Sequence, residues 1–348
     1  MADTTVYRLA LIGFGSAGQG LAQILRDHSA ALMHRYGVDL RIVAICTQRR
    51  GSLYDPQGLD PAALLAAIAH DGHLRSVEGQ RDWSPLDMID QATADVLIEL
   101  SPTNLSTGEP ATSHMRAALG RGMHTITANK GPIALHLPEL RRLAADARLY
   151  LGYEGTVMSG TPALRLGWSD LAGCEVRELR GIVNGTTNYI LTQMEGGMSY
   201  ADALAEAQRL GYAEADPTGD VEGYDAAAKA VILANVVMDA RLSLADIERA
   251  GITTLTRDTI EAARASGERW KLIARVWRAG AQVHASVQPT RLPISHPLAS
   301  ADGATNALTY TTDLLGEVTL IGPGAGGVAT GFAVISDVLA LHMLWGSR

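Results

Sequence analysis

A glycine-rich turn between an apolar strand and an amphipathic helix constrains this chain more than any other feature. Residues 7–12 read YRLALI, and Gly13, Gly15 and Gly18 follow in the spacing G-x-G-x-x-G. The first glycine permits a tight turn, the second admits a pyrophosphate to the backbone, and the third lets helix and strand pack closely. Because the turn joins a strand to a helix, it predicts a dinucleotide site, against the alternative of a turn that binds nothing. The residues expected to contact the cofactor here are Gly13, Phe14, Gly15, Ser16, Ala17 and Gly18.

Strand-like runs alternate with helical patterns through the first half of the chain. After 7–12, such runs occupy 40–46, 94–100 and 123–128. This alternation predicts an α/β fold with a Rossmann-type doubly wound parallel sheet. Residues 57–84 match the alternation poorly, so we expect an extra helix and loop there.

Two further loops are expected to border the cofactor. Ser101, Pro102 and Thr103 follow one predicted strand, and Lys130 follows another. Open α/β sheets bind ligands beyond the carboxyl ends of their strands. These residues are therefore candidate cofactor contacts, and Lys130 is also a candidate catalytic residue, with a solvated loop lysine as the alternative.

The pattern changes after residue 150 and predicts a second, α+β domain. Trp270 and Trp277 are seven residues apart, which we interpret as one face of a helix. A second glycine turn, 322–327, precedes an apolar helix and returns the chain to the first domain; Gly326 either closes over the cofactor or only begins the helix. The predicted domains are 1–150, completed by about 322–348, and 151–321. Strands are expected at 176–183, 283–292, 308–313 and 318–321, and a helix at 224–240.

Composition excludes several classes of protein. The chain has 348 residues, 47% of them hydrophobic, which allows about two globular domains. Its formal net charge of −8 argues against a nucleic-acid partner. Two cysteines, no recognisable signal peptide and no apolar run of about 20 residues predict a cytoplasmic protein that is not embedded in a membrane.

The end of the second predicted strand bears on the choice of cofactor. An NAD site commonly has an acidic residue there, but this chain has Arg49 and Arg50. Guanidinium groups suit a 2′-phosphate, so the pair favours NADP over NAD. The alternative is that both arginines are solvated loop residues.

A group of carboxylates precedes a single lysine in residues 210–229. Asp225 and Lys229 are four apart and share one helix face, while Glu214 and Asp220 lie before them in a loop broken by glycines. A surface ion pair is the simplest interpretation, but the helix that follows is apolar nearly all round, and a buried lysine requires partners. We therefore interpret the group as a functional site.

The chemistry of this group suits the reduction of a carbonyl. When a nicotinamide delivers hydride to a carbonyl carbon, the oxygen needs a proton, and a lysine ammonium can donate one. Neighbouring carboxylates can orient that ammonium or bind a substrate ammonium. The expected substrate is a small zwitterion that carries a carbonyl group.

The chain resembles the homoserine dehydrogenases over nearly its whole length. The motifs that carry the resemblance are GFGSAG, ELSPTN, TANKGP, YEGTVMSGTP, GIVNGTTNYIL, EAQRLGYAEADPTGDVEGYDAAAK and GPGAGG. The resemblance implies reversible NAD(P)-dependent reduction of L-aspartate 4-semialdehyde to L-homoserine. It also implies a short form that lacks the regulatory domain found in many members. A related oxidoreductase for another amino-acid semialdehyde, or a dinucleotide-binding regulator without turnover, remains the alternative.

The resemblance also implies roles for individual residues. Lys229 and Lys130 match catalytic lysines, and Asp220 matches a carboxylate that orients Lys229. Substrate contacts are implied for Glu214, Asp225, Tyr212, Gly185 and Thr186. A monovalent cation, Na⁺ or K⁺, is implied near Glu154, Val157, Ser159 and Thr161, and the protein is expected to be a homodimer. In this family, arginines at the positions of Arg49 and Arg50 accompany NADP or poor turnover, so the resemblance leaves the cofactor preference open.

Overall fold

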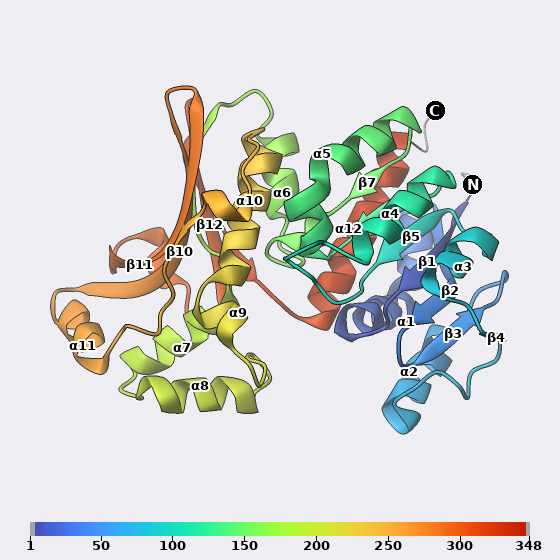
Figure 1. Cartoon of the computed structure of the whole chain (residues 1–348), viewed down its shortest axis with the longest axis horizontal. Coiled ribbons are helices and arrows are strands. Elements are labelled where there is room, and N and C mark those ends of the chain that lie inside the picture. The colour runs from blue at the N-terminus through green and yellow to red at the C-terminus, as the bar shows by residue number, and fades with distance from the viewer. Residues whose placement is uncertain (1–3, 346–348) are drawn as a thin grey trace. The chain divides into compact units, whose positions relative to one another are not determined.

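The computed structural model describes residues 4–345 and divides into two compact units (Figure 1). Unit 1 contains the chain up to Gly160 together with the segment from Gly326 onward, and unit 2 is Thr161–Ala325. The boundary therefore falls about ten residues after the predicted one, because the segment before Gly160 packs on unit 1. Its Glu154 backbone N–H, for example, donates to Asp337 at 3.0 Å. The ends of the predicted ranges, residues 1–3 and 346–348, lie outside the described residues.

Unit 1 is built on a seven-stranded sheet in the order β4-β3-β2-β1-β5-β6-β7. Strands β2, β1, β5, β6 and β7 are parallel, whereas β3 and β4 add an antiparallel edge beside β2. This edge lies next to and within the stretch in which only a helix and loop were predicted. The strands are β1 (Thr5–Ile12), β2 (Val38–Thr47), β3 (Gly51–Tyr54), β4 (Gln80–Arg81), β5 (Val96–Glu99), β6 (His124–Thr127) and β7 (Leu151–Gly152).

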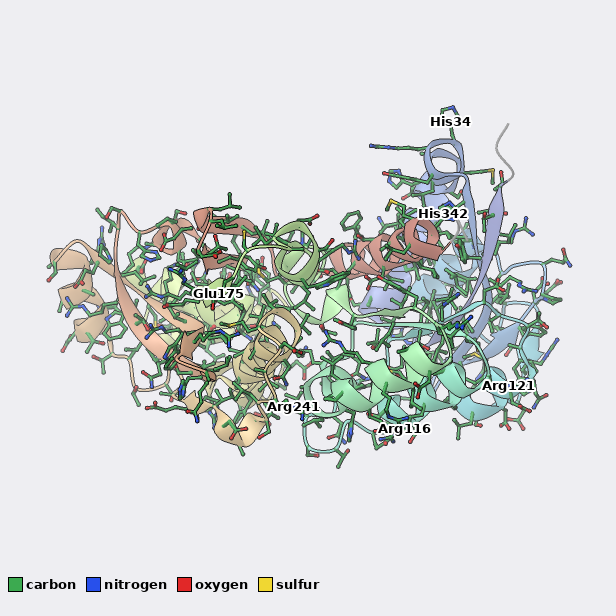
Figure 2. The ribbon with its side chains drawn as sticks, turned by 90° about the horizontal axis from the view of Figure 1, so that it is seen from above. His34, Arg116, Arg121, Glu175, Arg241 and His342 are labelled. Atoms are coloured by element: carbon green, nitrogen blue, oxygen red, sulfur yellow. The ribbon has the colours of Figure 1, made fainter. Side chains whose placement is uncertain are left out.

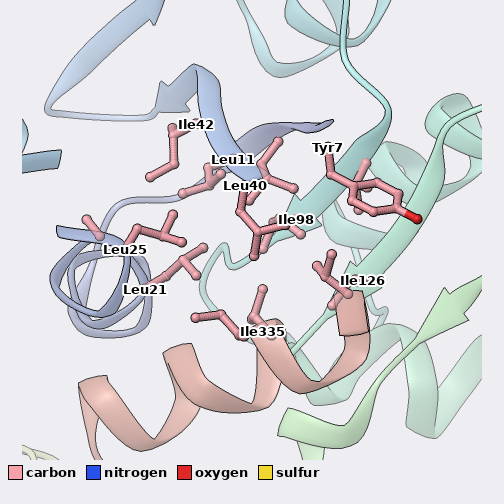
Figure 3. Close-up of a cluster of buried hydrophobic side chains, with 14 of the residues drawn as sticks. Tyr7, Leu11, Leu21, Leu25, Leu40, Ile42, Ile98, Ile126 and Ile335 are labelled. Carbon is pink, nitrogen blue, oxygen red and sulfur yellow. The ribbon is translucent and has the colours of Figure 1, made fainter. Parts of the chain in front are cut away.

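Helices cover both faces of this sheet, which confirms the predicted doubly wound class. On one face, Leu21 and Leu25 of α1 and Ile335 of α12 pack against strand residues such as Leu11 (Figure 3). On the other face, side chains of α3 and α4 pack against β1, β2 and β5. The helices are α1 (Ser16–Tyr36), α2 (Pro61–Asp71), α3 (Pro85–Gln91), α4 (Ala111–Gly120), α5 (Lys130–Asp146) and α12 (Gly327–Trp345).

An arginine on the surface of unit 1 joins two of its helices. Figure 2 shows Arg116, on α4, and Arg121, which directly follows this helix. Arg116 pairs with Glu109 at 3.1 Å and with Glu139 of α5 at 2.7 Å, so it ties the two helices together. Both ion pairs are partly exposed, and we expect each to contribute at most about 1 kcal/mol to the free energy of unfolding.

Helix α12 brings the far end of the chain into the core of unit 1. By length and composition, residues Gly327–Leu344 are apolar enough to cross a membrane, but half of this window is buried inside the protein. Val334, Ile335 and Val338 are at most 2% exposed and belong to the same cluster as the central strands. Burial against the sheet therefore explains the apolar side chains on the buried face of this helix.

Unit 2 is built on a six-stranded sheet in the order β13-β12-β8-β10-β11-β9. All neighbouring pairs are antiparallel except β11 and β9. Its strands are β8 (Val176–Ile182), β9 (Glu248–Arg249), β10 (Glu268–Ala279), β11 (Gln282–Pro293), β12 (Thr305–Thr312) and β13 (Gly316–Pro323). Its helices are α6 (Ala163–Arg165), which continues as a π-turn (Leu166–Asp170), α7 (Gly185–Glu195), α8 (Tyr200–Arg209), α9 (Thr218–Val221), α10 (Tyr224–Val237) and α11 (Arg257–Ala265).

The helical interpretation of Trp270 and Trp277 was wrong. Both lie on β10, which pairs with β11 along its whole length. Side chains alternate along a strand, so a spacing of seven places the two rings on opposite faces of the sheet. Trp277 stacks on His284 of β11 with ring centroids 5.5 Å apart, a cross-strand contact that the local sequence does not reveal.

Candidate active site

The glycine turn of unit 1 has the geometry of a phosphate-binding loop. Gly13 has a φ of 96°, and a Cβ there would lie 2.5 Å from the carbonyl oxygen of Leu100, so only glycine is accommodated. Gly15 is the N-cap of α1, and a Cβ there would meet no atom within 4 Å. The backbone at Gly15 is therefore open to a ligand at the N-terminus of a helix of 21 residues. A pyrophosphate group suits this position.

The loop after β5 is fixed by two buried polar side chains. The Glu99 carboxylate, which is completely buried, accepts hydrogen bonds from both the hydroxyl and the backbone N–H of Ser101. Asn129 donates through Nδ2 to the carbonyls of Ser101 at 3.0 Å and Pro102 at 3.3 Å. These contacts hold the predicted cofactor loop at the carboxyl end of β5, beside the glycine turn.

Lys130 and Thr103 differ in their exposure to solvent. Asn129 is the N-cap of α5, so Lys130 is the first residue of that helix and is half-buried. Thr103 and Pro102 are exposed. Lys130 is thus held at the carboxyl end of β6, where ligands of such sheets bind.

The two arginines after β2 have separate environments. Arg50 Nη1 donates to the carbonyl of Phe14 at 2.7 Å, so this guanidinium fastens the glycine turn. Gln19 donates to the same carbonyl at 3.2 Å. Arg49 is exposed. Of the pair, Arg49 is the more exposed, and Arg50 is the one with a contact to the glycine turn.

The residues predicted to surround a cation are divided between the two units. In unit 1, Glu154 is 3% exposed, and Ser159 has a φ of 53° and shares a hydrogen bond of 2.8 Å with Thr330. Val157 is completely buried in the same segment. In unit 2, the Thr161 hydroxyl donates to the carbonyl of Pro323 at 2.9 Å. In residues 4–345 no group of three or more His, Cys, Asp or Glu side chains gathers as a metal site.

Gly326 stands where the chain enters α12. Its φ of 128° is in the region that favours glycine, and the helix begins at Gly327. The turn is therefore a helix entry. The contact of Gly326 with the cofactor stays a prediction.

Lys229 is a buried cation of unit 2. It is 8% exposed, its Nζ lies 2.7 Å from Asp225 Oδ2, and it donates to the carbonyl of Val183 at 2.6 Å. The carboxylate lies one helical turn before the lysine on α10, as the spacing of four predicts. The carbonyl comes from the end of β8. An ammonium held by one charge and one dipole has a fixed orientation, and both contacts offset the cost of burying it.

Asp220 and Asp225 are joined through a side chain that the sequence analysis did not single out. Asn184 donates through Nδ2 to Asp220 Oδ1 at 2.7 Å and to Asp225 Oδ2 at 2.9 Å. Burial, and then the nearby charge of Asp225, raise the pKa of Asp220, while hydrogen bonds and Lys229 act in the opposite direction. The contact with Lys229 is made by Asp225, whereas Asp220, predicted to orient the lysine, reaches this group through Asn184.

The remaining predicted substrate residues fall into two groups. Thr186 donates to the carbonyl of Tyr212 at 2.6 Å, so the first turn of α7 is tied to the start of the acidic segment. Gly185 is next to Asn184, and a Cβ there would lie 2.7 Å from the carbonyl of Ala304. Glu214 is exposed on the turn before α9, and its carbonyl accepts a hydrogen bond from Gln208 at 3.0 Å.

Comparison with known proteins decides the family. The family model described as homoserine dehydrogenase matches residues 162–339. The chain is 46% identical to an NAD(+)-dependent homoserine dehydrogenase from Pseudomonas canavaninivorans over 97% of each chain. The chain belongs to the homoserine dehydrogenase family. The predicted family is therefore confirmed.

Solved structures of homoserine dehydrogenases share the fold. A crystal structure from Thiobacillus denitrificans is 31% identical with a TM-score of 0.87, and covers 100% of this chain and 76% of that one. A hyperthermophilic archaeal homoserine dehydrogenase in complex with NADPH is 30% identical with a TM-score of 0.84, and covers 98% of this chain and 99% of that one. The predicted α/β fold class is confirmed.

The residues that the sequence analysis missed are those that fix the predicted site residues in place. Glu99, Asn129 and Asn184 are buried and bond to residues of the candidate site. Asn129 and Asn184 are the N-caps of α5 and α7, and each directly precedes a predicted site residue. Asparagine before a helical pattern is a capping signal that can be recognised in the sequence. Their second role, bonding across to another loop, depends on segments that only folding brings together.

Proposed function

We propose that this protein catalyses the reversible NAD(P)H-dependent reduction of L-aspartate 4-semialdehyde to L-homoserine, a step toward threonine, methionine and isoleucine. The observation that carries the proposal is the buried ammonium of Lys229, bound to Asp225 and to the carbonyl of Val183. The glycine turn, with its open backbone at Gly15, supplies a site for the dinucleotide. Family membership selects this reaction among carbonyl reductions.

In the proposed mechanism, Lys229 is the acid. A nicotinamide dinucleotide held at the glycine turn would supply the hydride for the aldehyde carbon. Lys229 donates a proton to the carbonyl oxygen as negative charge develops there, and Asp225 and the Val183 carbonyl hold the ammonium in place. In homoserine oxidation the neutral Lys229 amine takes the hydroxyl proton. A positioned acid of this kind accelerates a reaction roughly 10²–10⁴-fold.

Other residues are assigned to substrate binding. Carboxylates of the acidic segment, Asp225 and Glu214, attract the substrate ammonium, and the α7 N-terminus at Gly185 and Thr186 presents backbone N–H groups suited to its carboxylate. Tyr212 lies beside Thr186. Lys130 supplies positive charge near the nicotinamide and the substrate.

The assay is homoserine oxidation at alkaline pH with NAD and NADP in parallel, followed at the nicotinamide absorbance. Replacing Lys229 with alanine should lower kcat by roughly 10²–10⁴-fold, because the acid is lost, while NADPH still binds by fluorescence titration. Near-normal turnover by K229A would rule out Lys229 as the acid. Turnover of a different semialdehyde, with none of homoserine, would favour the related oxidoreductase instead.

We propose NADP as the preferred cofactor, through Arg49. Arg49 is exposed at the end of β2, whereas Arg50 is bound to the Phe14 carbonyl. R49A should raise the KM for NADPH several-fold more than the KM for NADH, since it removes a phosphate partner. R50A loosens the glycine turn and should raise both KM values alike. If R49A also affects the two cofactors equally, the enzyme does not use Arg49 to read the 2′-phosphate, and NAD becomes the better assignment.

We further propose that the protein is a cytoplasmic homodimer. Leu314 and Leu315, at the tip of the β12–β13 hairpin, are 70% and 62% exposed, and Ile321 on the edge strand β13 is 49% exposed. A hairpin tip and an edge strand with exposed apolar side chains can pair with another chain. A second copy of the protein presents the same surface, so the two copies can form a symmetric contact. Both cysteines, Cys46 and Cys174, are free, which suits a reducing compartment.

We also propose that the segment beginning at Glu154 binds a monovalent cation. The buried carboxylate of Glu154 and two consecutive residues in left-handed conformation, Met158 and Ser159, support it. Left-handed turns redirect backbone carbonyls, and carbonyl oxygens are the ligands of such ions. The cation would stabilise this segment and take no part in proton transfer.

A further inference from the structure

Asn184 occupies a position at which its amide orientation is set by a helix. It is the N-cap of α7, where its Oδ1 accepts hydrogen bonds from the Thr187 backbone N–H at 2.9 Å and the Thr187 hydroxyl at 3.0 Å. The side chain is 4% exposed. Because the oxygen is engaged with the helix, the NH₂ group must face the other way.

The NH₂ group has two hydrogens, and each has one carboxylate partner. One bond reaches Asp220 Oδ1 at 2.7 Å from α9, and the other reaches Asp225 Oδ2 at 2.9 Å from α10. That same oxygen of Asp225 lies 2.7 Å from Lys229 Nζ. Val183, whose carbonyl accepts from Lys229, directly precedes Asn184. The turn between β8 and α7 therefore fixes the lysine directly and its carboxylate partner through the amide.

We propose that Asn184 is a positioning residue for the reaction: by donating one hydrogen to each of Asp220 and Asp225, it offsets the repulsion between the two carboxylates and holds Asp225 against Lys229. This rests on the proposed function of Lys229. Two neighbouring carboxylates repel each other, and a donor shared between them favours the charged form of both. Without the amide, either Asp225 turns away from Lys229 or one carboxylate takes up a proton.

The expected direction of a pH effect follows from the groups that face the amide. These are Asp220 from α9, Asp225 and Lys229 from α10, and the uncharged Thr186 from α7, whose hydroxyl also lowers the pKa of Asp220. The hydrogen bond from Asn184 lowers the pKa of Asp220, against burial and Asp225, which raise it. Loss of the amide should therefore raise the pKa of Asp220 further, and the acidic limb of the pH–rate profile should move to higher pH.

Two variants separate this role from helix capping. Serine and aspartate are both good N-caps, so N184S and N184D retain the start of α7. N184S lacks a donor long enough to reach both carboxylates. N184D has the size of asparagine but places a third acceptor where the two donors were. T187V is the matched control, since it removes a hydroxyl from the capping side of Asn184 and leaves the NH₂ contacts intact.

The experiment measures kcat, KM and the pH–rate profile for homoserine, together with NADPH affinity. We expect kcat to fall at least about tenfold in N184S and about a hundredfold in N184D, within the range that a positioned acid provides. The acidic limb should move up in pH, with NADPH affinity unchanged. T187V should lower the melting temperature without moving the limb. Normal kcat and an unmoved limb in N184S would overturn the proposal, even if N184D fails to fold.

A second readout does not require turnover. The carboxyl resonances of ¹³C-labelled aspartate report the titration of Asp220 and Asp225 directly. A raised midpoint in N184S supports the proposal, and an unchanged midpoint contradicts it. If the unsubstituted protein fails to oxidise homoserine, the proposed function fails, and this titration still decides whether Asn184 controls the carboxylates.

Discussion

At the scale of single residues, Lys271 shows how a charge can be buried away from the candidate site. It lies on β10 with 0% exposure, and its Nζ donates to Asn188 Oδ1 at 2.9 Å and to the Ala301 carbonyl at 2.7 Å. Burial, and then the charge of Arg269, lower the pKa of Lys271 from 10.5 to about 8. The ammonium fixes the segment after β11 to α7, at a cost in stability while it is charged.

Lys271 should make the stability of the protein rise with pH in the alkaline range. Between pH 8 and 10.5 the unfolded chain binds more protons at this lysine than the native state does, so its penalty is complete below pH 8 and is relieved as pH rises. Across this pH range, Lys271 should change the free energy of unfolding by about 3 kcal/mol. Urea unfolding from pH 7.5 to 10.5 should show a smaller rise for K271M than for the unsubstituted protein. Parallel curves for the two proteins would contradict the lowered pKa.

At the scale of elements, two helices far apart in the sequence pack through glycines. A Cβ on Gly20 of α1 would lie 2.0 Å from the Gly327 carbonyl oxygen, and a Cβ on Gly331 of α12 would lie 2.4 Å from the Leu21 backbone nitrogen. The backbones of α1 and α12 therefore touch, and no larger residue fits between them. This contact ties the helix of the glycine turn to the C-terminal helix.

Substitution of Gly331 with alanine should separate the two helices. Because the methyl group meets backbone atoms, we expect a loss of about 1–3 kcal/mol in the free energy of unfolding, measured in urea. V328A is the control on the same helix, since Val328 is 47% exposed, and it should change stability by less than about 0.5 kcal/mol. Equal effects of G331A and V328A would show that the contact is unimportant.

At the scale of the whole molecule, the proposed homodimer depends on the exposed hairpin of unit 2. Replacing Leu314 and Leu315 together with glutamate should yield monomers by light scattering after gel filtration, because like charges would face each other across the symmetric contact. L86E is the control, since Leu86 of α3 is 52% exposed in unit 1, and it should remain dimeric. A double variant that stays dimeric would place the interface elsewhere.

Local signals in the sequence determined the glycine turn, most strands of both sheets and the helix that carries Asp225 and Lys229. Each depends on residues close together in the chain, where turn chemistry and side-chain period act. The prediction failed at β10, because its two tryptophans suited a helix locally and only pairing with β11 makes the segment a strand.

Tertiary structure alone decided which residues hold the site together. Asn184 bridges Asp220 and Asp225 across 36 and 41 residues, and Arg50 reaches Phe14 across 36. The partners of Asn184 and Arg50 depend on which loops come into contact after folding. The residues next to them in the sequence do not indicate those contacts. The chemistry of the lysine was readable because a helix repeats every 3.6 residues, whereas the network that aims it was not, because its contacts have no period.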